Sequence, residues 1–72
     1  MAYGFKHEYF AYVIEIGFHD PWTSAWMTGT KRLAADSEND MIKTVQRYDA
    51  YYKDTYGASA YCHNLGKVSQ NT

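Results

Sequence analysis

The stretch that decides the fold runs from His7 to Phe18 and reads HEYFAYVIEIGF. From Phe10 onward, large aromatic or β-branched residues occupy every second position: Phe10, Tyr12, Ile14, Ile16 and Phe18. This strict alternation is typical of a β-strand with one buried face. A helix over the same residues would place Glu15 among apolar neighbours and would have to include Gly17. The pattern therefore predicts a strand from His7 to Phe18.

The other side of this strand is also unusual. Its residues are Tyr9, Ala11, Val13, Glu15 and Gly17. A solvated sheet face is normally more polar than this set. We therefore expect that something covers this second face.

A second strand is predicted after a turn at residues 19–24, because Asp20 and Pro21 favour a turn and proline cannot donate to a β-ladder. The strand should run from about Ala25 to Leu33. Its two sides are Trp26, Thr28, Thr30 and Arg32, against Ala25, Met27, Gly29, Lys31 and Leu33. Either side could face the core. Gly29 in the middle predicts a bulge or a close backbone approach.

A helix is predicted to begin at Asp36 or Ser37, which are good N-cap residues, and to continue to about Tyr56. Its apolar stripe consists of Met41, Val45, Tyr48 and Tyr52. Gly57 is a natural helix-ending residue. A short third strand should follow over 58–63, with Ala58, Ala60 and Cys62 directed inward. Residues 64–66 read as a turn and residues 67–72 as a polar tail.

The predicted order is thus strand, strand, helix, strand in a single domain of 72 residues. A right-handed crossover between the second and third strands would place the first strand in the centre, with antiparallel neighbours. The expected fold class is α+β: a small three-stranded antiparallel sheet with one amphipathic helix packed on one face.

Length and composition limit the function. A core of this size rarely supplies more than about 3–5 kcal/mol without a disulfide or a metal. The single cysteine, Cys62, cannot close an intramolecular disulfide, which favours a reducing compartment. A net charge of −1 argues against a strongly basic nucleic-acid binder and against an acidic DNA mimic. The sequence shows no secretory signal and no membrane-spanning stretch, so we expect a cytoplasmic protein with no membrane partner.

No catalytic or cofactor-binding pattern is apparent. Cys62 and His63 would point to opposite faces of a strand, and the three histidines lack zinc-site spacing. The five glycines form no phosphate-binding loop. We therefore predict a non-enzymatic protein with no cofactor and no metal.

The remaining indication of function comes from the aromatic residues, since thirteen of the 72 residues are Tyr, Phe or Trp. Tyr and Trp are enriched at interface hot spots. Two interpretations of Trp22 and Trp26 stay open: they either close the ends of a small core or belong to an interface. The residues that we predict to bind a partner are Tyr9, Val13, Glu15, Trp22, Trp26, Arg32 and Tyr61.

In size and strand order the chain resembles small phage-encoded anti-defence proteins, including anti-CRISPR inhibitors. The resemblance covers the whole chain in outline and no motif. It implies stoichiometric inhibition of a bacterial host or defence protein, and it carries no functional residue over. A homodimer and an antitoxin-like blocker of a toxin nuclease are compatible with the same features.

A second hypothesis is single-stranded nucleic-acid or nucleotide binding. The sheet aromatics Tyr9, Trp26 and Tyr61 would then stack on bases. The phosphates would be contacted by Lys31, Arg32 and Lys67. The net charge makes this the weaker hypothesis.

Overall fold

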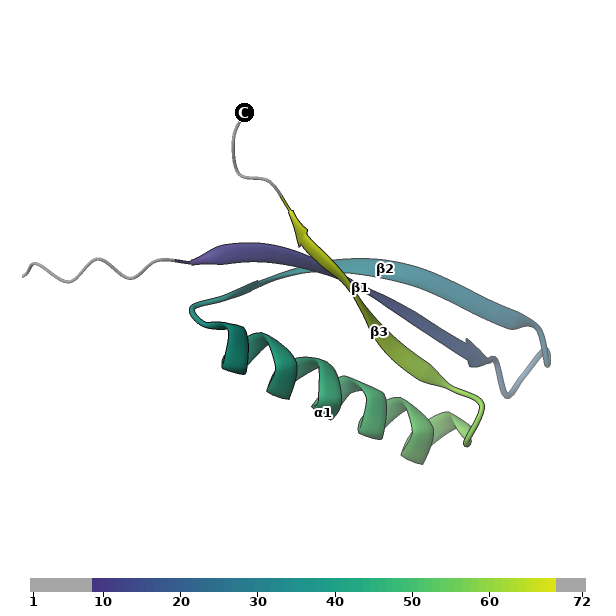
Figure 1. The fold of residues 1–72 in the computed structure, drawn as a ribbon. Helices are drawn as coiled ribbons and strands as arrows, with labels where there is room; N and C mark the ends of the chain where they lie inside the picture. The colour runs from purple at the N-terminus through teal and green to yellow at the C-terminus, as the bar shows by residue number, and fades with distance from the viewer. Residues whose placement is uncertain (1–8, 69–72) are drawn as a thin grey trace, which may run out of the picture.

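The computed structural model describes residues 9–68 of the chain and contains four elements (Figure 1). They are β1 (Phe10–His19), β2 (Trp26–Ala35), α1 (Glu38–Tyr56) and β3 (Tyr61–Val68). The strands form one antiparallel sheet in the order β2-β1-β3, and α1 lies across one face of it. The predicted α+β class, element order and central first strand are all confirmed.

The pairing of β1 with β2 settles which side of β2 faces the helix. The register is continuous from Phe10 opposite Ala35 to His19 opposite Trp26. Opposed residues of antiparallel strands share a face. We call the side of the sheet that α1 covers the helix face. On β2 this face consists of Met27, Gly29, Lys31, Leu33 and Ala35. The other side of β2 lies on the open face of the sheet and consists of Trp26, Thr28, Thr30, Arg32 and Ala34.

The predicted irregularity at Gly29 is wrong. The β1–β2 pairing shows no register shift there, and a Cβ built on Gly29 meets nothing within 4 Å. The irregularity instead lies in the pairing of β1 with β3, where the register shifts between Val13 and Ile14. Leu65 is the extra residue at this bulge, and the positive φ of Gly66, 115°, accommodates it.

The strand boundaries also differ from the predictions. The strand expected over 58–63 is β3 and runs from Tyr61 to Val68, so the predicted turn at 64–66 lies inside it. The first two residues of the predicted tail belong to β3 as well. Pairing with β1 over seven positions overrides the turn preference of the Asn-Leu-Gly sequence. β2 ends two residues later than predicted, and β1 begins at Phe10, with His7 and Glu8 outside the described residues.

The predicted helix limits are confirmed. Ser37 is the N-cap, and its side-chain oxygen accepts a hydrogen bond from the Asp40 N–H at 3.0 Å. At the other end Gly57 has a φ of 113°, which favours glycine, and its N–H donates to the Lys53 carbonyl at 2.9 Å.

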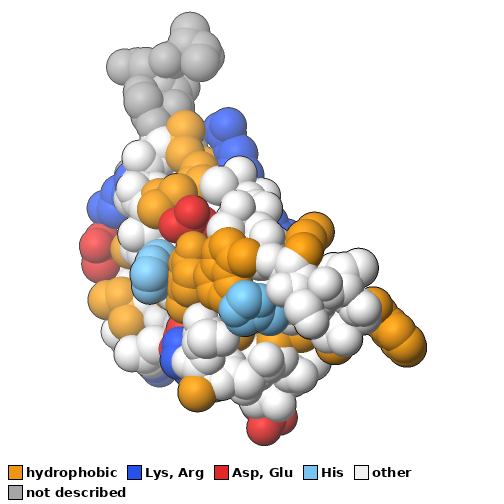
Figure 2. Space-filling view, turned by 90° about the vertical axis from the view of Figure 1, so that its right-hand side faces the viewer, with side chains coloured by type: hydrophobic (Ala, Val, Ile, Leu, Met, Phe, Trp, Pro, Cys, Tyr) orange, Lys and Arg blue, Asp and Glu red, His pale blue; other side chains and the backbone are white. Residues whose placement is uncertain are grey.

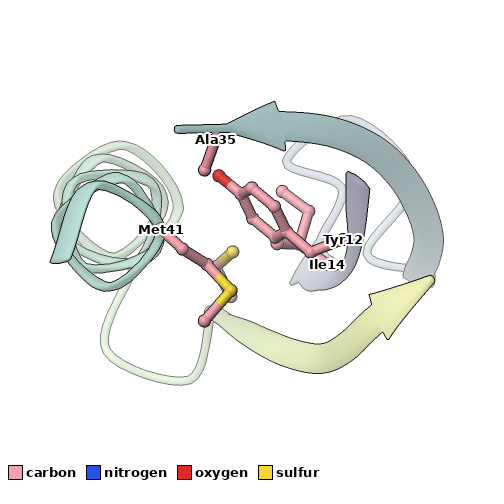
Figure 3. Close-up of a cluster of buried hydrophobic side chains, with 5 residues drawn as sticks. Tyr12, Ile14, Ala35 and Met41 are labelled. Atoms are coloured by element: carbon pink, nitrogen blue, oxygen red, sulfur yellow. The ribbon is translucent and has the colours of Figure 1, made fainter. Parts of the chain in front are cut away.

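The core lies between the helix face of the sheet and the apolar stripe of α1. Tyr12 and Ile14 of β1 are fully buried, and Met41 of α1 points toward them (Figure 3). Burial raises the pKa of the Tyr12 hydroxyl. Further along the helix, the ring of Phe18 stacks on that of Tyr56 with 4.2 Å between centroids. The small buried core is thus extended by half-buried rings.

A polar tie holds α1 to β3. The Asp49 carboxylate accepts hydrogen bonds from Lys53 Nζ at 2.7 Å and from the backbone N–H of Cys62 at 3.0 Å. These bonds, that from Lys53 foremost, lower the pKa of the Asp49 carboxyl. Because Cys62 is buried, the pKa of its thiol is raised, and the thiol belongs to the core rather than to a reactive site.

Candidate protein-binding face

The open face is the side of the sheet that α1 does not cover. On β1 its residues are Ala11, Val13, Glu15, Gly17 and His19, which β2 and β3 flank. Val13 lies between Arg32 and Gly66, and Glu15 lies between Thr30 and His63. No element of the described residues 9–68 packs over this side.

Four rings form an aromatic array on the open face, contributed by all three strands. His19 of β1 meets Trp26 of β2 edge-on, with 4.7 Å between ring centroids. Trp26 lies 6.0 Å from Tyr61 of β3, and Tyr61 stacks on His63 at 4.2 Å. Figure 2 shows hydrophobic side chains gathered between histidine side chains on this side of the molecule. Trp26 remains 44% exposed, so the array is a surface rather than a second core.

Gly17 is the residue that allows this array to form. A Cβ built on Gly17 would lie 2.5 Å from Cε2 of the Tyr61 ring, far inside van der Waals contact. The Tyr61 ring therefore lies directly over the β1 backbone. Without a side chain at position 17, the ring can lie flat on the sheet and reach Trp26.

Charged groups on the open face are few and of both signs. Glu15 is half-buried and Arg32 is exposed. Neither belongs to an ion pair within 4 Å among the residues that the structure describes.

The β1–β2 hairpin loop projects a further ring beyond the sheet. The Asp20 side chain accepts a hydrogen bond from the Trp22 N–H at 2.8 Å, and the Asp20 carbonyl accepts one from the Ser24 N–H at the same distance. Ser24 has a φ of 63°, in the left-handed region that some tight turns use. The turn thus holds the Trp22 side chain 91% exposed.

The structure brings five of the seven predicted binding residues together on the open face: Val13, Glu15, Trp26, Arg32 and Tyr61. Trp22 lies apart from them in the hairpin loop. Tyr9 precedes β1 and is 61% exposed. Sequence reasoning missed His19 and His63 as members of this face. It placed Gly17 on the same side as Val13, but it did not predict that the Tyr61 ring would lie over Gly17. The alternation already placed His63 on the side of Tyr61, but no local pattern shows that His19 meets Trp26.

The basic residues of the nucleic-acid hypothesis do not share one surface. Lys31 lies on the helix face, with its Nζ 6.0 Å from the centre of the Tyr48 ring. Lys67 pairs with Glu38 at 2.9 Å and lies over the ring of Phe10. Arg32 alone of the three shares a face with Trp26 and Tyr61.

Within residues 9–68, no group of three His, Cys, Asp or Glu side chains is arranged to hold a metal ion. Cys62 and His63 lie on opposite faces, one in the core and the other in the array. The described part of the chain has no helix of the length and apolarity needed to cross a bilayer.

Comparison with known proteins finds no protein family, no curated protein and no solved structure that matches this chain.

Proposed function

We propose that this protein is a non-enzymatic protein-binding module and that its open face is the binding surface. The observation that carries the proposal is the exposed array of His19, Trp26, Tyr61 and His63. Tyr and Trp supply large, rigid contact area with a polar tip, and they dominate interface hot spots. A small domain that holds such rings on an uncovered sheet face has a ready-made contact surface.

The chemistry of the face indicates what a partner must offer. An apolar surface would cover Val13 and the array. A carboxylate could pair with Arg32, and a basic group could pair with Glu15, since neither has an ion pair within the described chain. A partner surface of mixed charge around an apolar centre satisfies these conditions.

For the biological role we propose stoichiometric inhibition of a bacterial host or defence complex, in the bacterial cytoplasm. The support is the resemblance in size and strand order to phage-encoded anti-defence proteins, together with a surface suited to protein binding. An antitoxin-like blocker would use the same surface on a toxin nuclease. Nucleic-acid binding is less favoured, because Lys31 and Lys67 lie on the helix face, away from the array.

The binding proposal is tested by capture from bacterial lysates with and without nuclease treatment. We expect a protein to be retained by the wild type and by Tyr51→Ala, which removes an exposed helix ring outside the open face. The double variant Trp26→Ala and Tyr61→Ala should lose it, because each hot-spot ring contributes about 2 kcal/mol, or roughly 30-fold in affinity. Retention that disappears on nuclease treatment would contradict protein binding and favour the nucleic-acid hypothesis.

The inhibitor proposal needs a functional readout. Phage plating is measured on bacteria that carry a defined defence system and express either the wild type or the double variant. We expect the wild type to raise the plating efficiency in at least one defence background and the double variant to fail. Equal plating with both proteins across all backgrounds would contradict inhibition through this face, while a toxin-rescue assay addresses the antitoxin-like role.

A further inference from the structure

The two outer edges of the sheet differ in how well they could accept another strand. The edge strand β3 carries the bulge at Leu65 and the positive φ of Gly66, which interrupt its ladder. The edge strand β2 has ten residues, no proline and an unbroken register with β1. Bulges protect sheet edges, whereas a long regular edge is a template for a further strand. Within residues 9–68, no strand pairs with the outer edge of β2.

Apolar surface on the helix face continues up to this edge. α1 packs more closely on β3 than on β2, and a groove of about 440 Å³ lies between α1 and β2. Its lining includes Ile16, Phe18, Met27, Gly29, Lys31 and Tyr52. Met27 is 44% exposed there. A strand added beside β2 would therefore gain side-chain contacts as well as backbone hydrogen bonds.

The side chains of β2 are complementary to a second copy of the same strand. A two-fold axis perpendicular to the sheet makes the strands antiparallel and places one residue opposite itself. An axis at Lys31 would place the Lys31 side chains of the two copies directly opposite each other, and such a pair of like charges is destabilising. An axis at Gly29 would leave Leu33, Ala34 and Ala35 without a partner in β2, because they would face residues that precede Trp26. An axis at Thr30 pairs residues 26–34, all of which belong to β2.

We propose that two copies of this chain pair through their β2 edges about an axis at Thr30. This register places a smaller residue opposite a larger one at three positions: Trp26 faces the partner's Ala34, Thr28 faces the partner's Arg32 and Gly29 faces the partner's Lys31. At the fourth position Met27 faces the partner's Leu33, so two apolar side chains are paired. The space next to Gly29, where a built Cβ meets nothing within 4 Å, can receive the facing lysine.

The pairing produces a continuous six-stranded antiparallel sheet. Because the axis is perpendicular to the sheet, both helices lie on one side and both open faces on the other. Leu33 of the partner subunit then lies beside the exposed Met27 at the mouth of the groove. The proposal concerns the edge of the sheet and does not depend on the proposed function of the open face.

Cysteine cross-linking tests the register. Residues directly opposed in an antiparallel pair have Cα atoms about 4.5–5.5 Å apart, within the range of a disulfide. Thr30→Cys should therefore form a disulfide-linked dimer under mild oxidation. Thr28→Cys is the matched control, because its two copies would lie roughly 14 Å apart along the strands. A failure of Thr30→Cys to cross-link, or equal cross-linking of both variants, would overturn the register.

Charges introduced at Gly29 test whether the two β2 strands pair, and light scattering measures the oligomeric state. We expect a dimer for the wild type and for Gly29→Glu, which faces the partner's Lys31. Gly29→Lys opposes two lysines and should weaken dimerisation at least 10-fold. Adding Lys31→Glu to Gly29→Lys should restore the dimer. Circular dichroism checks that each variant is folded, as the open space at Gly29 leads us to expect.

A monomeric wild type, or equal dimerisation of Gly29→Lys and Gly29→Glu, would overturn the proposal. Either result would leave the open-face capture experiment interpretable, since Tyr61 lies on β3, at the opposite edge of the sheet from the proposed pairing. Conversely, a dimer whose open-face variants still capture the partner would contradict the proposed function alone.

Discussion

The helix face and the open face of the sheet receive alternate residues of the same strand, β1, but only the helix face buries large side chains of that strand completely. Tyr12 and Ile14 on the helix face are completely buried. Their neighbours Val13 and Glu15, on the open face, remain partly exposed. Both faces carry apolar side chains, but α1 covers only the helix face.

The comparison shows two uses of aromatic residues in a chain that has no disulfide. On the helix face, rings such as Phe18, Tyr52 and Tyr56 stack with one another and extend a core that is too small to stabilise the fold by aliphatic residues alone. On the open face, Trp26 and Tyr61 meet across three strands and remain accessible. The first group stabilises the domain, and the second group forms a surface.

The largest expected difference between the faces comes from shortening neighbouring residues of β1. Ile14→Ala should lower the free energy of unfolding by about 3 kcal/mol, which approaches the whole stability of a domain this small. Val13→Ala should cost less than about 1 kcal/mol, because its side chain is already partly solvated. Urea unfolding followed by circular dichroism measures both. A comparable loss for Val13→Ala would show that the open face is packed in solution.

Gly17→Ala tests whether the array depends on close contact between Tyr61 and the backbone. The added methyl group overlaps the outer atoms of the Tyr61 ring, which can swing away, so we expect a cost of about 1–2 kcal/mol. Near-ultraviolet circular dichroism and Trp fluorescence should change as Tyr61 leaves Trp26. Gly29→Ala is the control, since nothing lies within 4 Å of its Cβ. Unchanged spectra for Gly17→Ala would contradict the array.

Asp49→Asn tests the polar tie between α1 and β3. The folded state lowers the pKa of Asp49, so its carboxylate stabilises the fold above the ordinary carboxyl pKa and loses this effect as the pH falls through the lowered value. We expect the variant to be less stable by about 1 kcal/mol at neutral pH. The difference should vanish in acid. Unfolding curves recorded across this pH range measure it, and a constant difference would contradict the role of the charge.

The smallest effect on stability is expected for Trp22→Ala. Its side chain is 91% exposed in the hairpin loop, so the free energy of unfolding should change by less than about 0.5 kcal/mol. Thermal unfolding of the variant checks this. A large loss would revive the interpretation that this ring closes the core, while a loss of partner capture alone would extend the binding surface to the loop.

Predictions from the sequence succeeded where the signal was local. The alternation from Phe10 to Phe18 identified the central strand, and Ser37 with Gly57 marked the ends of the helix. They failed at β3, where the Asn-Leu-Gly sequence indicated a turn but pairing with β1 extended the strand through a bulge. Gly29 was expected to interrupt β2, yet a glycine in an edge strand needs no irregularity when nothing lies above it.

The sequence predicted only part of the candidate site, because its signals are local to each strand. Five predicted residues share the open face, since alternation assigns each side chain to one side of its own strand. The alternation does not show which sides of two strands lie on the same face of the sheet. The register of β2 with β1 was therefore needed to assign Trp26 to the open face rather than to the helix face.

The sequence by itself determined the element order, the helix limits and the two-sided apolar character of β1, because these depend on periodicities of two and 3.6 residues within single segments. Only the tertiary structure decided the extent of β3, the side of β2 that faces the helix and the meeting of His19, Trp26, Tyr61 and His63. Those features depend on pairing between strands distant in sequence, and a shift of one residue in that register would move every side chain of a strand to the opposite face.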